Sequence, residues 1–171
     1  MKKIVFVVHC IINTNVMIQD LTTVKKYPGN INDVVRVLIN NKIGVVQLPC
    51  PEKIIFGLKR RRATKTSFLK NPKFIKVCEK IANNIIQEIK TYQKEGFEVA
   101  FILGKRGSPS CGVIETHIEG KSGAFCIKGQ GILFEIIEKK LLENDLKIPL
   151  IDFEHEHVEE CLDEMKKLIS F

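Results

Sequence analysis

The stretch Ile4-Val5-Phe6-Val7-Val8, which lies directly before His9 and Cys10, is apolar at every position. A short continuous apolar run is typical of a strand that is buried on both faces of a parallel sheet. Similar runs recur at three later places, residues 45–48, 99–103 and 149–153. The sequence therefore predicts a sheet of about four strands.

Amphipathic helices are predicted between and after these strands. Apolar residues recur at helical spacing in residues 32–41, 71–96, 130–144 and 158–168. The longest helix should begin at Asn71-Pro72, because an N-cap side chain there precedes a proline at the first helical position. Strand and helix alternate four times, which predicts an α/β fold. We expect a single-domain Rossmann-like or flavodoxin-like sandwich over residues 1–171, with a mainly parallel sheet and helices on both faces.

Three segments do not fit this alternation. Residues 11–30 contain no sustained apolar period, which predicts a long loop with room for one helical turn. Residues 57–70 are polar and basic, and we interpret them as a mobile lid over the crevice at the sheet edge. Residues 113–129 alternate polar and apolar positions with interspersed glycines, which indicates an extended excursion or a small hairpin.

Length and cysteine usage favour a cytoplasmic protein. The chain has 171 residues, enough to bury a core without disulfide staples. Its six cysteines are too sparse for a secreted disulfide scaffold, and the apolar stretch at its start is too short for a signal peptide. No apolar run approaches the roughly 20 residues that span a bilayer. We therefore expect reduced thiols and no membrane partner, and the oligomeric state is left open.

The charge is unevenly distributed. Lys and Arg outnumber Asp and Glu by 27 to 20, which gives a net charge of +7. The basic residues concentrate between Lys53 and Lys76, whereas the last quarter of the chain, from Glu135, is rich in acids. Such a distribution favours anionic partners, nucleic acid among them, without identifying one.

Three cysteines share one position relative to the predicted sheet. Cys10, Cys50 and Cys111 each follow an apolar run, and residues just beyond the carboxyl ends of parallel strands converge on one crevice. Soft thiolates in a reducing compartment suit an iron–sulfur cluster or zinc. Three protein ligands would leave the fourth metal position open for a substrate. Pro49 and Pro51 stiffen the chain around Cys50, which suits a preorganised ligand.

The other cysteines fit this pattern less well. Cys78 and Cys161 lie on the apolar stripes of predicted helices, so we interpret them as core residues. Cys126 lies in the glycine-containing excursion, and its role as a fourth ligand, a redox thiol or a buried residue is left open.

The motif Ser108-Pro109-Ser110-Cys111-Gly112 resembles that of the 2-thiouracil desulfurase family. Cys50-Pro51-Glu52 and Gly57-Leu58 upstream are also similar to family motifs, as is Gly129-Gln130-Gly131 before a late helix. The resemblance implies a [4Fe-4S] cluster held by Cys10, Cys50 and Cys111, with one iron free. The chain departs from the family where Lys59-Arg60-Arg61-Arg62 replaces a proline–arginine ending.

The leading hypothesis is an enzyme that desulfurises a thiocarbonyl compound, a thiouracil-like base or a related small molecule. An open iron would bind the substrate sulfur while water attacks the carbon. Glu52 is the candidate base or substrate anchor, against a solvated loop carboxylate. Ser108 and Ser110 could hydrogen-bond the substrate or the cluster or serve only the turn, and Ser108 is the favoured one of the two. Lys105 could stabilise the leaving sulfide or be one more surface lysine.

Histidines are less favoured, and other functions stay open. Strand alternation points His9 away from Cys10, and His155 and His157 fit a solvated helix start. The first alternative is a non-enzymatic cluster or zinc protein, a sulfur carrier or sensor. The second is an RNA-binding protein that acts on a thiolated tRNA base through the basic segment.

Overall fold

Four parallel strands form the main sheet of the computed structural model, which describes residues 2–170. The strands are β1 (Lys3–Val8), β2 (Gly44–Leu48), β3 (Glu98–Lys105) and β6 (Leu150–Phe153). Their order is β2-β1-β3-β6, and every adjacent pair is parallel. The predicted fold class, a Rossmann-like or flavodoxin-like α/β sandwich with about four strands, is confirmed.

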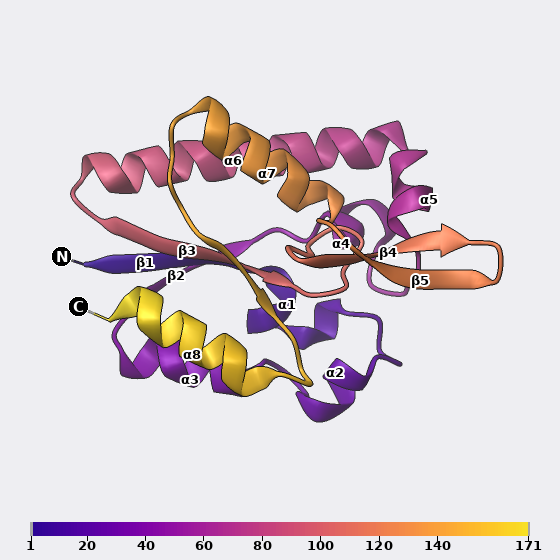
Figure 1. The fold of residues 1–171 in the computed structure, drawn as a ribbon, viewed down its shortest axis with the longest axis horizontal. Coiled ribbons are helices and arrows are strands. Elements are labelled where there is room, and N and C mark those ends of the chain that lie inside the picture. The colour runs from indigo at the N-terminus through magenta and orange to yellow at the C-terminus, as the bar shows by residue number, and fades with distance from the viewer. Residues whose placement is uncertain (1, 171) are drawn as a thin grey trace.

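Helices cover both faces of this sheet (Figure 1). On one face α3 (Asn32–Asn40) packs beside α8 (Val158–Ile169), and on the other α6 (Pro72–Lys94) packs beside α7 (Ile132–Glu143). All six residues of β1 are buried between these layers. No helix within residues 2–170 is long and apolar enough to cross a membrane.

The longest helix begins where the sequence predicts. The Asn71 side chain accepts hydrogen bonds from the backbone N–H groups of Lys73 and Phe74, both at 3.1 Å, and Pro72 occupies the first helical position. These contacts satisfy two donors that a helix start otherwise leaves without partners. The cap therefore fixes the point at which α6 starts to cross the sheet.

Residues 11–30 contain more structure than the single turn expected. They hold the end of α1 (His9–Ile12), the 3-10 turn η1 (Thr14–Val16) and α2 (Thr22–Lys26). Ile11, Val16 and Tyr27 are buried. The turns are too short for a repeating helical period, so their apolar residues give no periodic signal in the sequence.

Residues 51–70 form two short helices joined by an irregular segment. These are α4 (Pro51–Phe56) and α5 (Lys65–Leu69), and a capping box between Thr64 and Ser67 starts α5. Phe68 stacks on Phe74 of α6 with ring centroids 4.3 Å apart, which anchors α5 to the long helix. Movement of this segment as a lid stays a prediction.

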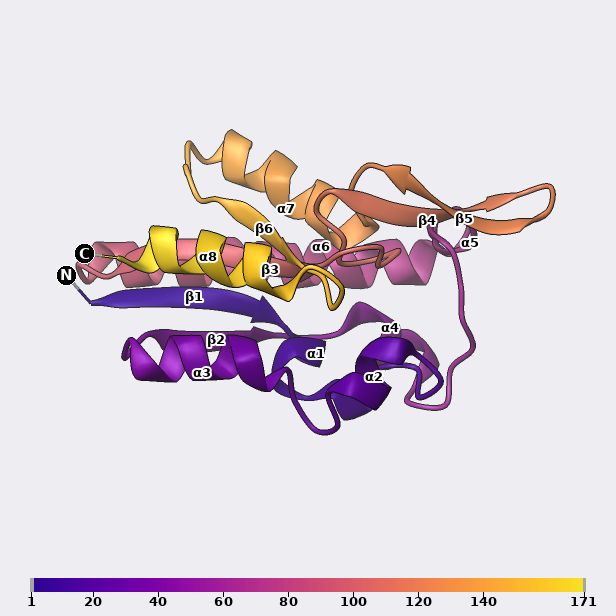
Figure 2. The same cartoon turned by 60° about the horizontal axis from the view of Figure 1, so that its bottom comes forward.

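The predicted excursion is an antiparallel hairpin. Strands β4 (Glu115–Gly120) and β5 (Gly123–Lys128) form a separate two-stranded sheet, and one bridge joins Thr116 of β4 to Gly107. Figures 1 and 2 show the hairpin projecting beyond the end of the main sheet. Phe125 and Cys126 are exposed on β5.

The first turn of α7 packs on the turn that holds Cys111. The N–H groups of Gly131, Ile132 and Leu133 donate to carbonyls in residues 109–112, at 2.8–3.1 Å. A side chain at Gly131 would have no room, because its Cβ would lie 2.4 Å from the Ser110 carbonyl carbon and 2.7 Å from the Cys111 nitrogen. The helix start thus supplies hydrogen bonds that hold the Cys111 turn in place.

Gly131→Ala should destabilise the protein, because the new methyl group would collide with the backbone of the Cys111 turn. We expect a loss of about 1–3 kcal/mol in the free energy of unfolding, as for other overpacked sites. Urea unfolding followed by circular dichroism measures the loss, with Gln130→Ala as the neighbouring control. Equal stability of the Gly131→Ala variant and the wild type would contradict the close packing.

Candidate functional site

The three predicted ligand cysteines follow three adjacent strands. Cys10 lies in α1 directly after β1, Cys50 is the N-cap of α4 after β2, and Cys111 lies in the turn after β3. The order β2-β1-β3 reverses the direction of chain progression at β1, and ligands of such sheets bind outside the carboxyl ends at this switch point. Figure 2 shows α1 and α4 at this end of the sheet, opposite the chain termini.

The three thiols lie close enough for the charge of Cys50 to act on both Cys10 and Cys111. Burial raises the pKa of Cys10 to about 12, with a further contribution from Cys50. Burial likewise raises the pKa of Cys111, and the charges of Cys50 and Cys10 raise it further. Burial also raises the pKa of Cys50, although the Lys53 N–H donates to its sulfur at 3.4 Å. Each thiol is therefore neutral unless a nearby positive charge stabilises the thiolate.

The three thiols have the donor chemistry that an iron–sulfur cluster uses. Within residues 2–170, no group of three or more His, Cys, Asp or Glu side chains is arranged to hold one metal ion. Ligands of an iron–sulfur cluster bind separate irons, so their sulfurs need not converge on one point. Thiols whose ionised form gains from positive charge, as here, are the donors that such a cluster uses.

Glu52 lies among the cysteines, as expected from its position after Cys50. The Ser110 hydroxyl donates to Glu52 Oε1 at 2.6 Å, and Arg60 Nε donates to Oε2 at 2.9 Å. The side chains of Glu52 and Arg60 are only 13% and 7% exposed. The carboxylate is therefore oriented at both oxygens and is not a freely solvated loop group.

The two serines of the motif have different contacts. Ser108 Oγ accepts from the backbone N–H of Cys111 at 3.0 Å and of Ser110 at 3.3 Å, so it shapes the turn. Ser110 is 1% exposed and is the serine that contacts Glu52. Sequence reasoning favoured Ser108, because nothing in the motif shows which hydroxyl faces the carboxylate. A catalytic role for Ser108 stays a prediction.

Lys105 lies at the end of β3, the strand between β1, which leads to Cys10, and β6, which carries Asp152. Burial lowers its pKa, while the charges of Cys10 and Asp152 oppose this change. Its ammonium makes one long hydrogen bond, 3.5 Å to the Arg106 carbonyl, and no ion pair with any described residue. Lys105 therefore has donor capacity to spare near the Cys10 sulfur.

Sequence reasoning missed Asp152, at the end of β6. This buried carboxylate accepts the N–H of Val113 with both oxygens at 3.0 Å and the N–H of Ile114 at 2.7 Å. Burial raises its pKa to about 6, although these hydrogen bonds act in the opposite direction. Asp152 thus fixes the chain just after Cys111. A lone acid in an apolar run was the available signal, and the sequence could not show its partners.

Cys78 and Cys161 lie in the core, as the sequence predicts, and Cys126 lies on the surface. Cys78 and Cys161 are buried on α6 and α8. Cys78 lies close enough to Glu52 and Cys50 for their charges, after burial, to raise its pKa to about 12. Cys126 is exposed on β5, where its thiol lies 3.6 Å from Glu115.

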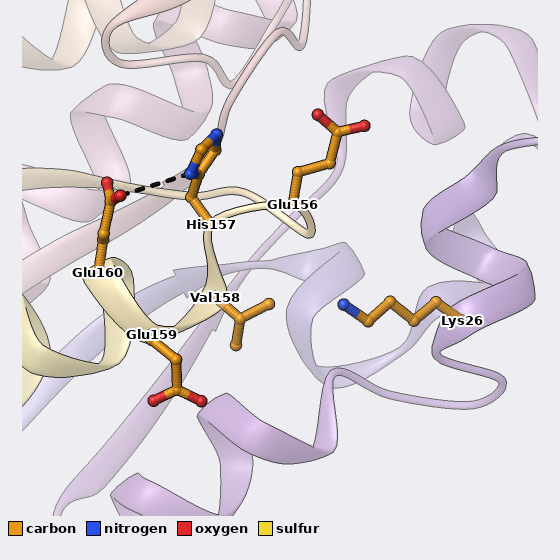
Figure 3. Close-up of a pocket in the computed structure, with 6 residues that line it drawn as sticks. All are labelled: Lys26, Glu156, His157, Val158, Glu159 and Glu160. Carbon is orange, nitrogen blue, oxygen red and sulfur yellow. Dashed lines mark ion pairs between the residues drawn. The ribbon is translucent and has the colours of Figure 1, made fainter.

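The histidines contribute few contacts to this site. His9 lies in α1, and burial followed by the charge of Lys53 lowers its pKa. His155 is hydrogen-bonded to Thr23 at 3.2 Å. Burial, followed by the positive charge of Lys105, lowers the pKa of His155. His157 pairs with Glu160 at 3.4 Å beside a pocket of about 370 Å³ between α2 and the start of α8 (Figure 3). None of the predicted site residues lines that pocket.

The basic segment between Lys53 and Lys76 is partly occupied by internal contacts. Arg60 pairs with Glu52, Arg62 with Asp20 and Lys65 with Glu135. Other cations of the segment, Lys59 and Arg61 among them, are exposed. Binding of RNA by this surface stays a prediction.

Comparison with known proteins supports the fold. No protein-family model matches the chain. An uncharacterized protein of Methanocaldococcus jannaschii is 28% identical over 152 residues, which span 89% of this chain and 86% of the relative. The solved structure of the [4Fe-4S]-dependent thiouracil desulfidase TudS matches 98% of this chain and 99% of its own, with a TM-score of 0.55 and 16% identity. At 16% identity this likeness shows a shared fold, and the protein of the solved structure is an enzyme.

Asp152→Asn should flatten the pH dependence of stability of the metal-free protein. The pKa of Asp152 is about 6 in the native state against 3.8 ordinarily, so the native state holds this proton more tightly than the unfolded chain does. Wild type should therefore lose stability as the pH rises from about 4 to 6.5, by at most about 3 kcal/mol. Urea unfolding across this range measures the slope, with the exposed Asp163→Asn as the control. Equal slopes for wild type and Asp152→Asn would be inconsistent with this assignment.

Proposed function

We propose that this protein is an iron–sulfur-dependent desulfidase that hydrolyses the C=S bond of a small thiocarbonyl compound. The observation that supports it most is the position of Cys10, Cys50 and Cys111 at the carboxyl ends of β1, β2 and β3. They lie there in a fold shared with a [4Fe-4S]-dependent thiouracil desulfidase. A thiouracil-like base is the substrate class that this likeness favours.

Cys10, Cys50 and Cys111 would hold the [4Fe-4S] cluster as thiolates. When bound, the cluster supplies a soft Lewis acid at the iron that no cysteine occupies, which suits a thiocarbonyl sulfur. The reaction needs no oxidant or reductant, because water adds to the carbon and sulfur departs as hydrogen sulfide. The protein must then activate the water and accommodate the charge of the departing sulfur.

Glu52 is the residue best placed to accept a proton from the attacking water. Its carboxylate lies next to Cys50 and is held by the Ser110 hydroxyl at 2.6 Å. Two fixed hydrogen bonds leave other lone pairs of the carboxylate for a water molecule. A positioned carboxylate of this kind contributes typically a factor of about 10²–10⁴ to such a reaction.

Lys105 is the complementary group on the other side of Cys10. Its ammonium is half-buried, lies near the Cys10 sulfur and is not neutralised by a paired carboxylate among residues 2–170. A positive charge in a partly dry site stabilises a developing anion more strongly than in water. Lys105 would thus bind the substrate or the departing sulfide, while Ser108 holds the turn that presents Cys111.

The decisive experiment is iron and sulfide analysis of anaerobically purified protein, together with sulfide release from thiouracils. We expect about four irons and four sulfides per chain, as for one [4Fe-4S] cluster. Serine substitution of Cys10, Cys50 or Cys111 should remove the cluster and the activity. Cys161→Ser is the control, because Cys161 is buried, as Cys111 is, but lies on α8.

Each contrary outcome has a separate meaning. A cluster without sulfide release from any thiocarbonyl would favour a carrier or sensor protein over an enzyme. Zinc, or no metal after anaerobic reconstitution, would overturn the proposal. Release only from thiolated tRNA would move the substrate from a free small molecule to an RNA-borne base.

Glu52→Gln should lower kcat by about 10²–10⁴ while the cluster is retained, because the amide keeps the shape of the side chain but does not accept the proton. Sulfide release under anaerobic conditions measures kcat, and the visible spectrum measures the cluster. Glu79→Gln, an exposed acid on α6, is the control. A kcat unchanged by Glu52→Gln would exclude Glu52 as the base.

A further inference from the structure

Arg60 differs from its neighbours in the run Lys59-Arg60-Arg61-Arg62, because it is the buried member. Its side chain is 7% exposed, whereas that of Arg62 is 62% exposed. Arg60 Nε donates to Glu52 at 2.9 Å, and Nη1 donates to the carbonyls of Val16 at 2.8 Å and Gly57 at 3.3 Å. A buried guanidinium with this many partners holds a fixed orientation.

These contacts join all three cysteine-bearing segments. Val16 belongs to η1 in the segment that follows Cys10, and Glu52 follows Cys50 in α4. Ser110, which precedes Cys111, donates to the Glu52 oxygen that Arg60 does not use. A chain of guanidinium, carboxylate and hydroxyl therefore runs between segments that are far apart in the sequence.

The chain reaches this position through an unusual turn at Gly57. The backbone there has φ +75° and ψ −172°, a conformation that is essentially restricted to glycine. It ends α4 and sends the chain back, so that Arg60 meets a carboxylate eight residues earlier. The turn at Gly57 thus makes the contact between Arg60 and Glu52 possible.

We propose that Arg60 is a positioning residue that fixes the Glu52 carboxylate and locks the three cysteine-bearing segments into one frame. The part that concerns Glu52 rests on the proposed function, whereas the locking of the segments does not. Arginine suits this task because its planar fork donates from Nε and Nη1 in two fixed directions, which the single ammonium of lysine cannot reproduce. Removing it would leave the Glu52 carboxylate, 13% exposed, without its charged partner.

The first arm of the test is hydrogen exchange of the metal-free protein. Arg60→Ala and Arg60→Lys are compared with Arg61→Ala, which changes an exposed arginine of the same run. We expect both Arg60 variants to exchange faster in three separate segments, residues 13–18, 51–58 and 108–112, and Arg61→Ala to match wild type. Arg60→Lys keeps the positive charge and tests the fork itself, even if Arg60→Ala fails to fold.

The second arm is kinetic and uses the cluster-loaded protein. Arg60→Ala should lower kcat by roughly a hundredfold, the order expected for a misplacement of about 1 Å, with KM changed much less. Added methylguanidinium should restore part of kcat in Arg60→Ala and have no effect on wild type. A merely structural loss would not be rescued in this way.

The two arms separate the failure of this proposal from that of the proposed function. If the loaded wild type releases no sulfide, the proposed function fails, and the exchange data alone decide whether Arg60 locks the segments. If exchange rises only next to residue 60, the locking is wrong. If kcat in Arg60→Ala equals that of Arg61→Ala in an active enzyme, Arg60 does not position Glu52.

Discussion

The pairing of β1 with both β2 and β3 is the constraint on which the rest of the molecule depends. The buried strand Lys3–Val8 lies between its two parallel neighbours, and the chain changes direction across it. Because parallel strands end at the same edge, the residues that follow them must gather there. Cys10, Cys50 and Cys111 are separated by tens of residues in the chain, and this pairing alone brings them to one edge. Loss of the β1 pairing would therefore remove both the core and the site.

The site that results is electrostatically incomplete by itself. Burial disfavours all three thiolates, and the charge of Cys50 would raise the pKa of both Cys10 and Cys111. A positively charged group is the component that would favour all of them at once. The protein has meanwhile fixed the surrounding polar groups: Ser110 and Arg60 hold Glu52, and Asp152 holds the chain after Cys111. A rigid frame around groups that need a cation is what a preformed cofactor site requires.

The sequence predicted the elements that have a continuous or periodic apolar pattern, and the residues that directly follow the strands. The apolar runs gave the four strands, and the cap at Asn71-Pro72 gave the start of α6. It did not predict the short helices before Tyr27, because turns of three to five residues show no period. It also did not select Arg60 from a run of four cations, or Ser110 over Ser108. Those choices depend on the return of the chain at Gly57 and on the packing of α7, which are tertiary contacts without a local signal.

The arrangement of charge around Cys10 connects the fold to the chemistry. The negative charge of Glu52 raises the pKa of Cys10, while the positive charge of Lys105 lowers it, so both groups act on this sulfur. Glu52 arrives from the β2 side through α4, and Lys105 arrives at the end of β3. Hydrolysis of a C=S bond needs a proton acceptor where water attacks and a positive charge where sulfur departs. A sheet in which β1 ends at Cys10 can supply these two groups from the two strands that pair with β1, and so present them from opposite sides of the proposed site.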